Sequence, residues 1–212
     1  MRLAGRARSG AASKQGMGGL PDGGFLVVGL GNPGSELDRT RHNVGAEAIE
    51  LLARRCGERL RSDRSARARV ARARLGDGVV LAVPTTYMND SGLAVAALVR
   101  RFSPATLDRL VVAHDELDLP PGRVRVKLGG GTAGHNGLKS IQAHLHDPGY
   151  ARVRIGIGKP PGRQSGADYV LGRPGRAERE VLDIAVGTAA DAIEAMVLEG
   201  LEAAMNRFNA VP

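Results

Sequence analysis

The sequence predicts a single α/β domain, in which a twisted, mixed β-sheet is flanked by α-helices. Short apolar runs recur along the chain, as is typical of strands buried on both faces. Segments with helical spacing of apolar residues alternate with these runs, which is the order expected of an α/β sheet. The chain has 212 residues, 42% of them hydrophobic, and shows no internal repeat, so one core of ordinary size is expected.

The expected strands fall into two groups. Those that are mainly apolar and expected to be buried are residues 25–30 (FLVVGL), 79–83 and 110–114 (LVVAH). Those that alternate charged with apolar residues, and so have one polar face, are residues 66–74, 123–128 and 151–157. Ser91 is expected to cap the second helix. The expected helices are 44–55, 91 to about 102, about 137–144, 178–199 and a shorter one ending near Phe208.

The formal net charge of +8 attracts polyanions, of which nucleic acid is the first candidate. A GC-rich genome that encodes arginine in place of lysine explains the composition equally well. Nine arginines gather between Arg54 and Arg74, which predicts a broad positive field. Aromatic residues make up only 3% of the chain, so a surface that binds mainly by base stacking is disfavoured.

The ends of the chain, its cysteine content and its hydropathy limit the remaining classes. Residues 1–24 are rich in glycine and basic residues and lack the apolar stretch of a secretory signal, so we expect a disordered basic extension, with a transit peptide as the alternative. Residues 25–212 are expected to form the folded domain. A single cysteine, Cys56, excludes a disulfide framework. No apolar run approaches the roughly 18 residues of a membrane helix, so a cytoplasmic protein without a membrane partner is expected.

Residues 29–34, GLGNPG, follow the first strand and match the G-x-G-x-x-G pattern of dinucleotide-binding loops. That site also requires a helix to begin at the glycines, so that its N-terminus meets the pyrophosphate. Pro33 interrupts the segment here, and the helical pattern begins about ten residues late. A loop that presents Asn32 is therefore favoured over a nicotinamide or flavin site, which stays as the alternative.

A histidine and an aspartate form the candidate catalytic pair. His42 lies just before the first expected helix, and histidine has the pKa that general-base chemistry near neutrality requires. Asp115 comes first after a buried strand, where side chains of open α/β sheets point into a crevice. If Asp115 reaches His42, the two are a base and its orienting group. Because no serine lies in a G-x-S-x-G motif, water is the expected nucleophile.

Each member of the pair also has a plainer explanation. A single histidine more often does no more than hydrogen-bond a helix end. The acidic cluster of Asp115, Glu116 and Asp118 is compatible with a solvated turn or with a divalent cation.

Residues 129–137, GGGTAGHNG, join a basic strand to a helix. Glycine lets a backbone approach a ligand closely, and the N-terminus of a helix favours anions. Two strands beside this loop carry basic residues, Arg125 and Lys127 on one and Arg152 and Arg154 on the other. The combination predicts a phosphate site, whereas without the glycine loop ordinary charged strand faces would be favoured.

These segments together resemble the bacterial peptidyl-tRNA hydrolase family. The resemblance implies hydrolysis of the ester that joins a peptide, or an N-blocked amino acid, to tRNA. It also implies a monomeric α/β enzyme that uses no metal or other cofactor. The matching segments are GLGNPG at 29–34, TRHNVG at 40–45, PTTYMNDSG at 84–92, VAHDELDLPPG at 112–122, KLGGGTAGHNGLKSI at 127–141 and RVRIGIGKP at 152–160.

The resemblance also implies roles by position. His42 would activate water, Asp115 would orient His42, and Asn32 would help to separate blocked from free aminoacyl-tRNA. The positions implied in contacts with tRNA or peptide are Leu37, Tyr87, Asn89 and Asn136. The positions implied in contacts with tRNA phosphates are Arg125, Lys127 and Arg154.

Several positions depart from the family pattern. Leu37 stands where the family usually has tyrosine, and Ser65-Ala66-Arg67 replaces an aromatic pair. Asp90 replaces an apolar residue, Thr132-Ala133 replaces His-Gly, and the basic extension is not a family feature. A tRNA-binding paralogue without turnover is therefore one alternative, but the retained His42 and Asp115 favour an active enzyme.

Overall fold

The structure is a computed structural model that describes residues 19–210. The expected basic extension falls largely on residues 1–18, which lie outside the described residues. Its last six residues are described, and they lie against the folded body. Leu20 donates its backbone N–H to the carbonyl of Phe102 at 2.8 Å, and its side chain packs against the core.

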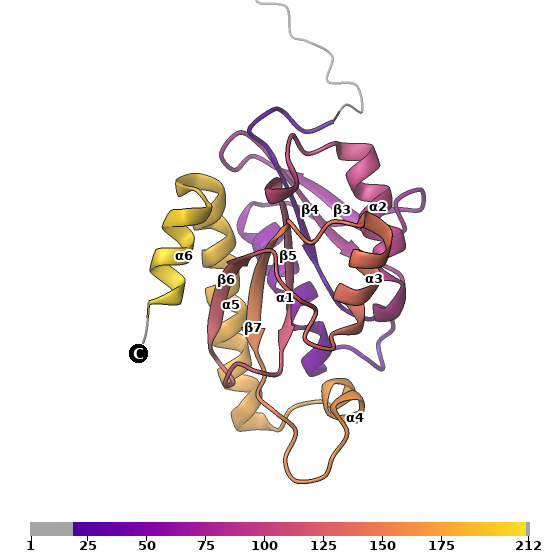
Figure 1. Ribbon diagram of the computed structural model, residues 1–212, viewed down its shortest axis with the longest axis vertical. Helices are drawn as coiled ribbons and strands as arrows, with labels where there is room; N and C mark the ends of the chain where they lie inside the picture. Colours follow the sequence, from indigo (N-terminus) through magenta and orange to yellow (C-terminus); the bar gives the residue numbers. More distant parts are fainter. Residues whose placement is uncertain (1–18, 211–212) are drawn as a thin grey trace, which may run out of the picture.

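One mixed sheet of seven strands forms the centre of the molecule, in the order β2-β3-β4-β1-β5-β7-β6 (Figure 1). The four central strands are parallel, and β2, β3 and β6 pair antiparallel with their neighbours at the edges. This architecture confirms the predicted α/β class. The strands are β1 Phe25–Gly29, β2 Arg61–Asp63, β3 Ala68–Ala73, β4 Val79–Pro84, β5 Leu110–Glu116, β6 Val124–Leu128 and β7 Ala151–Gly156.

Helices cover both faces of the sheet. On one face lie α1 (Val44–Arg55), α5 (Arg176–Glu199) and α6 (Leu201–Asn209), and on the other lie α2 (Ser91–Phe102) and α3 (Asn136–Leu145). The short α4 (Gly166–Leu171) stands apart at the lower end of the view in Figure 1. None of the helices described is long and apolar enough to cross a membrane. The 3-10 turns are η1 Arg41–Asn43, η2 Met88–Asp90 and η3 Leu107–Arg109.

Burial on both faces explains the apolar runs. In β1, Val27 packs into the core on the α1 and α5 side, whereas Leu26 and Val28 pack into the core on the α2 and α3 side. A strand in this position must be apolar at every residue, because successive side chains point to opposite faces.

Some local predictions need correction. Ser91 is not the helix cap but the first residue of α2, and its hydroxyl donates to the carbonyl of Met88 at 2.8 Å. The strand expected from residue 66 begins at Ala68, because residues 64–67 form a turn closed by the N–H of Arg67 and the carbonyl of Arg64. The elements β2 and α4 were not predicted, since both are short and neither has a clear apolar period.

Two glycines let α1 cross the sheet at backbone contact distance. A Cβ on Gly45 would lie 2.3 Å from the carbonyl oxygen of Ala113 in β5, and one on Gly29 would lie 2.3 Å from the carbonyl oxygen of Gly45. Both distances are too short for any side chain. The close crossing brings His42, just before α1, to the carboxyl end of β5, where Asp115 lies.

Candidate active site

A cavity of about 240 Å³ opens where the end of β5 meets η1 and the start of α3. Its walls include His42, Asp115, His135 and Asn136, with Val170 of α4 on the outer side. A larger hollow, of about 760 Å³, lies behind the GLGNPG loop, and its charged groups pair largely with one another. The smaller cavity is the candidate active site, because the predicted base and its aspartate open into it.

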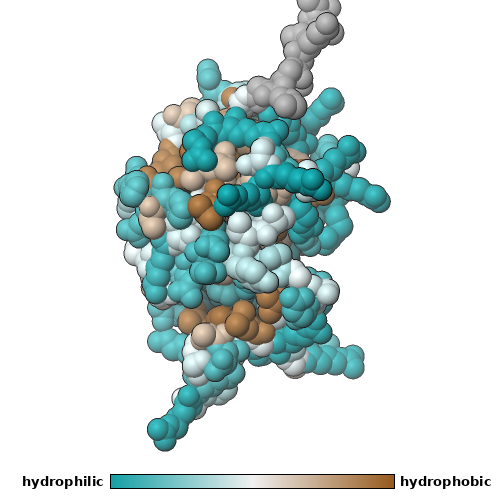
Figure 2. Space-filling model, turned by 90° about the vertical axis from the view of Figure 1, so that its right-hand side faces the viewer, coloured by the Kyte–Doolittle hydropathy of each residue, from teal (hydrophilic) through white to brown (hydrophobic). Residues whose placement is uncertain are grey.

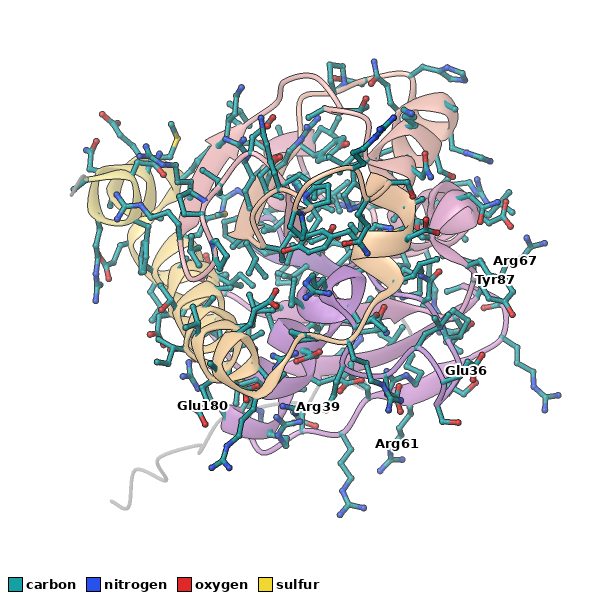
Figure 3. The ribbon with its side chains drawn as sticks, turned by 90° about the horizontal axis from the view of Figure 1, so that it is seen from below. Glu36, Arg39, Arg61, Arg67, Tyr87 and Glu180 are labelled. Atoms are coloured by element: carbon teal, nitrogen blue, oxygen red, sulfur yellow. The ribbon has the colours of Figure 1, made fainter. Side chains whose placement is uncertain are left out.

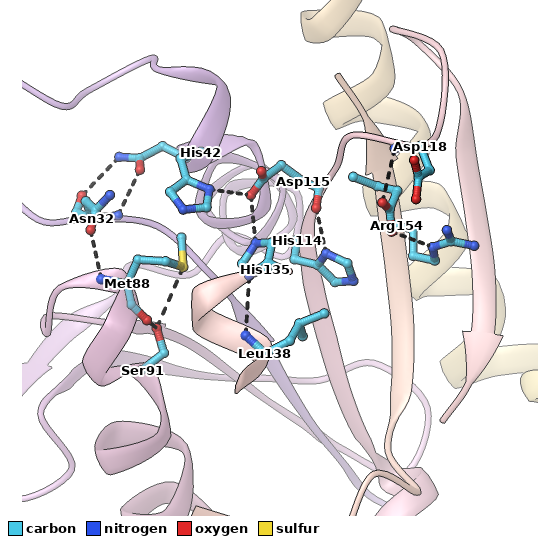
Figure 4. A network of polar contacts seen from close by, with 12 residues as sticks. Asn32, His42, Met88, Ser91, His114, Asp115, Asp118, His135, Leu138 and Arg154 are labelled. Carbon is cyan, nitrogen blue, oxygen red and sulfur yellow. Dashed lines mark hydrogen bonds and ion pairs between the residues drawn. The ribbon is translucent and has the colours of Figure 1, made fainter. Parts of the chain in front are cut away.

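The predicted catalytic pair is in direct contact (Figure 4). Nδ1 of His42 lies 2.8 Å from Oδ1 of Asp115. His42 is 7% exposed and Asp115 is 3% exposed, so the contact is shielded from water. A hydrogen bond to an ionised group in such surroundings is stronger than one between neutral groups.

A second histidine, His135, binds the same carboxylate oxygen. Its Nε2 lies 2.9 Å from Oδ1 of Asp115, and its Nδ1 accepts the backbone N–H of Leu138 at the start of α3 (3.3 Å). Sequence reasoning did not single out His135. Its position in the glycine loop, directly before a helix and beside Asn136, was the available signal.

These contacts assign the two ring tautomers. An ionised carboxylate oxygen can only accept hydrogen bonds, so each ring must donate an N–H to Oδ1 of Asp115. In His42 the proton is then on Nδ1, and Nε2 keeps its lone pair. In His135 both nitrogens are already used. His42 is therefore the ring of this pair that is equipped to accept a proton.

Asp115 stays ionised in this position. Burial raises the pKa of Asp115, but the charges and hydrogen bonds of His42 and His135 outweigh it, and the pKa lies well below the usual range for aspartate. Within residues 19–210, the same three side chains lie close enough together to hold a metal ion, with potential ligand atoms within 4.8 Å of one another. Hydrogen bonds alone account for their geometry, since both nitrogen–oxygen distances are those of charge-assisted hydrogen bonds.

His114 is a third histidine beside the pair, but it is not placed to act as a base. Its Nδ1 donates to the backbone carbonyl of Asp115 at 2.7 Å, and the ring is fully buried. Burial, and then the neighbouring His135, lower the pKa of His114 to about 3. The ring is therefore neutral at the pH values at which enzymes normally work.

Asn32 lines the larger hollow and not the cavity itself, and its neighbours hold it in place. Its Oδ1 accepts the backbone N–H of Met88 at 2.8 Å. The side chain of Asn43 holds the backbone of Asn32 through two hydrogen bonds. Its Oδ1 accepts the N–H of Asn32 at 2.8 Å, and its Nδ2 donates to the carbonyl of Asn32 at 3.0 Å. The side-chain Nδ2 of Asn32 has no partner among residues 19–210, so it is the donor that a ligand can use.

The predicted contact residues are not all gathered at the cavity. Asn136, the first residue of α3, lines it, whereas Leu37, Tyr87 and Asn89 do not. Tyr87 is 58% exposed and Asn89 is also exposed, on the turn that leads into α2. In the loop beside Asn136, Ala133 has a φ of 46°, in the left-handed region that favours glycine.

The basic residues of β6 and β7 lie side by side on one face. Arg125 pairs across the strands with Arg154, and Lys127 pairs with Arg152. Arg152 is buried and donates to the carbonyls of Gly130 and Gly131 at 2.6 Å each, so it shapes the glycine loop. Arg154 contacts Glu116 at 2.9 Å. Lys127 is exposed.

Arg41 ties the catalytic turn to α4 and α5, a contact that the sequence analysis missed. Its guanidinium makes two hydrogen bonds of 2.6 Å to Glu178 and lies 4.2 Å from the ring centre of Tyr169. It also donates to the carbonyl of Gly172 at 3.0 Å. Because Arg41 directly precedes His42, these contacts fix the turn that presents the base.

The fold and the site define an α/β enzyme whose centre is a buried histidine–aspartate pair. The profile of the family described as Peptidyl-tRNA hydrolase matches residues 26–212. The chain belongs to this family. The predicted helix does start late, at Val44, so the GLGNPG loop does not open a helix as a dinucleotide site requires.

Relatives and a solved structure agree with this assignment. A peptidyl-tRNA hydrolase of Nocardia farcinica is 52% identical over 195 residues, which cover 91% of this chain and 100% of the relative. One from Cutibacterium acnes is 50% identical over 196 residues, which cover 87% of this chain and 98% of the relative. The crystal structure of peptidyl-tRNA hydrolase from Acinetobacter baumannii matches with a TM-score of 0.83 at 38% identity, covering 91% of this chain and 98% of that chain.

The buried neutral ring of His114 predicts a loss of stability in acid. In the unfolded chain a histidine takes up a proton below about pH 6.5, whereas folded His114 does so only near pH 3. The free energy of unfolding therefore falls as the pH drops through this window. Between pH 7 and pH 4, the free energy of unfolding of His114→Gln should fall less than that of the wild type. The expected difference between the two falls is on the order of 3 kcal/mol, measured by urea unfolding.

The control is His144→Gln, which makes the same exchange at an exposed histidine of α3, so that the comparison isolates the effect of the buried ring. Equal slopes in the His114→Gln variant and the wild type would show that His114 is not held neutral.

Proposed function

We propose that this enzyme hydrolyses the ester bond between a peptide, or an N-blocked amino acid, and tRNA, by means of a water molecule that His42 activates. The observation that carries the proposal is the hydrogen bond of 2.8 Å between Nδ1 of His42 and Asp115, which leaves Nε2 of His42 able to accept a proton. Asp115 holds the ring in this tautomer and stabilises the imidazolium that forms.

In this scheme His42 first accepts a proton and then returns it. Nε2 takes a proton from water as the water oxygen attacks the ester carbonyl carbon and a tetrahedral intermediate forms. The bond from that carbon to the ribose oxygen then breaks, and the imidazolium returns the proton to the ribose oxygen. The products are free tRNA and the peptide with a new carboxyl group, which ionises and releases the second proton of the water to solvent.

Amide side chains are proposed to recognise the peptide end of the substrate. Asn136 lines the cavity and offers both a donor and an acceptor. The fixed side chain of Asn32 presents Nδ2, which we assign to the separation of blocked from free aminoacyl-tRNA. Leu37, Tyr87 and Asn89 lie farther out and are proposed to contact tRNA or peptide beyond the cavity.

A phosphate clamp, defined as Arg125, Lys127 and Arg154, is proposed to hold the tRNA backbone. The three side chains share one face of β6 and β7, beside the glycine loop. We further propose that the enzyme acts as a monomer, since one chain supplies the whole pair and cavity. The cytoplasm is the proposed location, because that is where translation produces the substrate.

The role of His42 is tested by release of N-acetyl-amino acid from N-acetyl-aminoacyl-tRNA with EDTA present. We expect the wild type to be active and His42→Ala to lower kcat by about 10²–10⁴-fold, the usual contribution of a positioned base. Binding of tRNA should change little. Substitution of the exposed His144 by alanine is the matched control and should leave kcat unchanged. A His42→Ala enzyme with more than half of the wild-type kcat would remove His42 from this role.

The clamp is tested with substrates that carry or lack the terminal 5′-phosphate. Substitution of Arg125, Lys127 and Arg154 by alanine should raise KM more than it lowers kcat, because the clamp contacts the tRNA away from the ester. Each lost phosphate contact should reduce the salt dependence of binding by up to about one unit of slope. Removal of the terminal 5′-phosphate should weaken substrate binding by the wild type, whereas the triple variant should bind both substrates about equally. If removal of the phosphate weakens binding equally in both proteins, the clamp lies elsewhere.

A further inference from the structure

The arginine-rich segment folds into an edge of the sheet that the candidate active site does not use. The segment from Arg54 to Arg74 contains nine arginines but only two acidic residues, in a chain with a net charge of +8. It supplies the end of α1, the strands β2 and β3 and the turn between them. In Figure 3, Arg61 and Arg67 project outward from the body of the molecule.

Five of these arginines fall into two groups. Arg55 pairs with Asp191 at 2.7 Å and Arg69 pairs with Glu50, so both are used in packing α1 against its neighbours. Arg61, Arg64 and Arg67 are exposed, and none makes an ion pair with a residue in the range 19–210. The second group therefore keeps its charge available for a partner.

Two of the exposed arginines, Arg61 and Arg64, border the larger of two adjoining hollows on the α2 side of this edge. The larger, of about 470 Å³, has Arg61, Arg64, Arg72 and Arg101 in its wall, and the smaller has Arg100 and Arg101. Together we call them the arginine hollow. One carboxylate lines it, that of Asp63, and both Arg101 and the hydroxyl of Ser65 already bind this group.

We propose that the arginine hollow binds the phosphate backbone of a second RNA duplex, separate from the tRNA end held at the active site. The planar guanidinium groups of arginine match phosphate oxygens in geometry as well as charge. Phe102 in the wall is buried, with Arg72 and Arg101 at 5.2 and 5.3 Å from its ring centre, so it offers no face to a base. Recognition through the backbone of a duplex fits these features.

An anionic lipid surface fits this region less well. The face seen in Figure 2 is mainly hydrophilic, and its apolar groups lie in small, separate patches. The large apolar side chains that are exposed in residues 19–210 do not line the arginine hollow. A membrane-binding surface normally combines basic residues with such side chains.

The position of the hollow places its ligand apart from the acceptor end of the substrate. The hollow lies at the β2–β3 edge, and the proposed clamp lies at the β6–β7 edge of the same seven-stranded sheet. Six strand spacings separate the outer strands, or roughly 29 Å. The helices α2 and α3 pack on the face between the two regions. This separation rests on the proposed clamp, whereas binding to the hollow itself does not.

The test measures binding of an RNA hairpin that lacks both the ester and the terminal 5′-phosphate of the substrate. Its stem has about 16 base pairs, a 5′-hydroxyl and no single-stranded 3′ end. By fluorescence anisotropy, substitution of Arg61, Arg64 and Arg100 by alanine should raise Kd about tenfold or more and lower the salt slope by up to about three units. The charge-matched control changes three exposed, ion-paired arginines away from the hollow to alanine, namely Arg55, Arg176 and Arg207.

The control variant should change Kd by less than about threefold. Equal losses of affinity in both triple variants would mean that the hairpin is held by general electrostatic attraction, and this result would overturn the proposal. The variant of the hollow should also keep kcat and KM on N-acetyl-aminoacyl-tRNA, with unchanged circular dichroism. A raised KM would instead assign the hollow to the substrate tRNA. Loss of binding to phosphatidylglycerol vesicles, with hairpin binding intact, would identify a lipid partner. Because the hairpin assay needs no turnover, it stands even if the proposed catalytic role of His42 fails.

Discussion

The geometry of the site depends on one atom, Oδ1 of Asp115, which accepts a hydrogen bond from each of two imidazole rings. This shared acceptor fixes the tautomers of His42 and His135 together and keeps Asp115 ionised in spite of its burial. The contact exists because Gly29 and Gly45 let α1 cross the sheet without side chains in between. A small shift of α1 would separate a base from its orienting group, and so the packing of the α1 backbone on β5 sets the chemistry of the cavity.

The catalytic pair and the two proposed binding regions lie at different strands across the sheet. The central strand β5 ends at the catalytic pair, and the β6–β7 edge carries the proposed clamp. The opposite edge carries the arginine hollow, which has no part in the proposed chemistry. Central strands are apolar because they are buried on both faces, whereas the edge strands have room for basic side chains.

Much of this could be predicted from the sequence, because apolar runs and alternation are local signals. They identified the central strands, and the step from loop to helix marked His42. The contact between His42 and Asp115 was a conditional prediction, since a pairing over 73 residues depends on how α1 crosses the sheet. His135 and Arg41 were missed for the same reason: their roles come from partners distant in sequence, Asp115 in one case and Glu178 in the other. The short β2 and α4 carry too few residues for a periodic signal.

The central claim is that Asp115 holds the two rings in opposite tautomers. The direct measurement is a ¹H–¹⁵N correlation spectrum of the histidine side chains, recorded at a pH where the rings are neutral and assigned with His42→Gln and His135→Gln variants. The account predicts a proton on Nδ1 and a bare Nε2 for His42, and a proton on Nε2 and a bare Nδ1 for His135. A His42 ring with its proton on Nε2 and a bare Nδ1 facing Asp115 would contradict it.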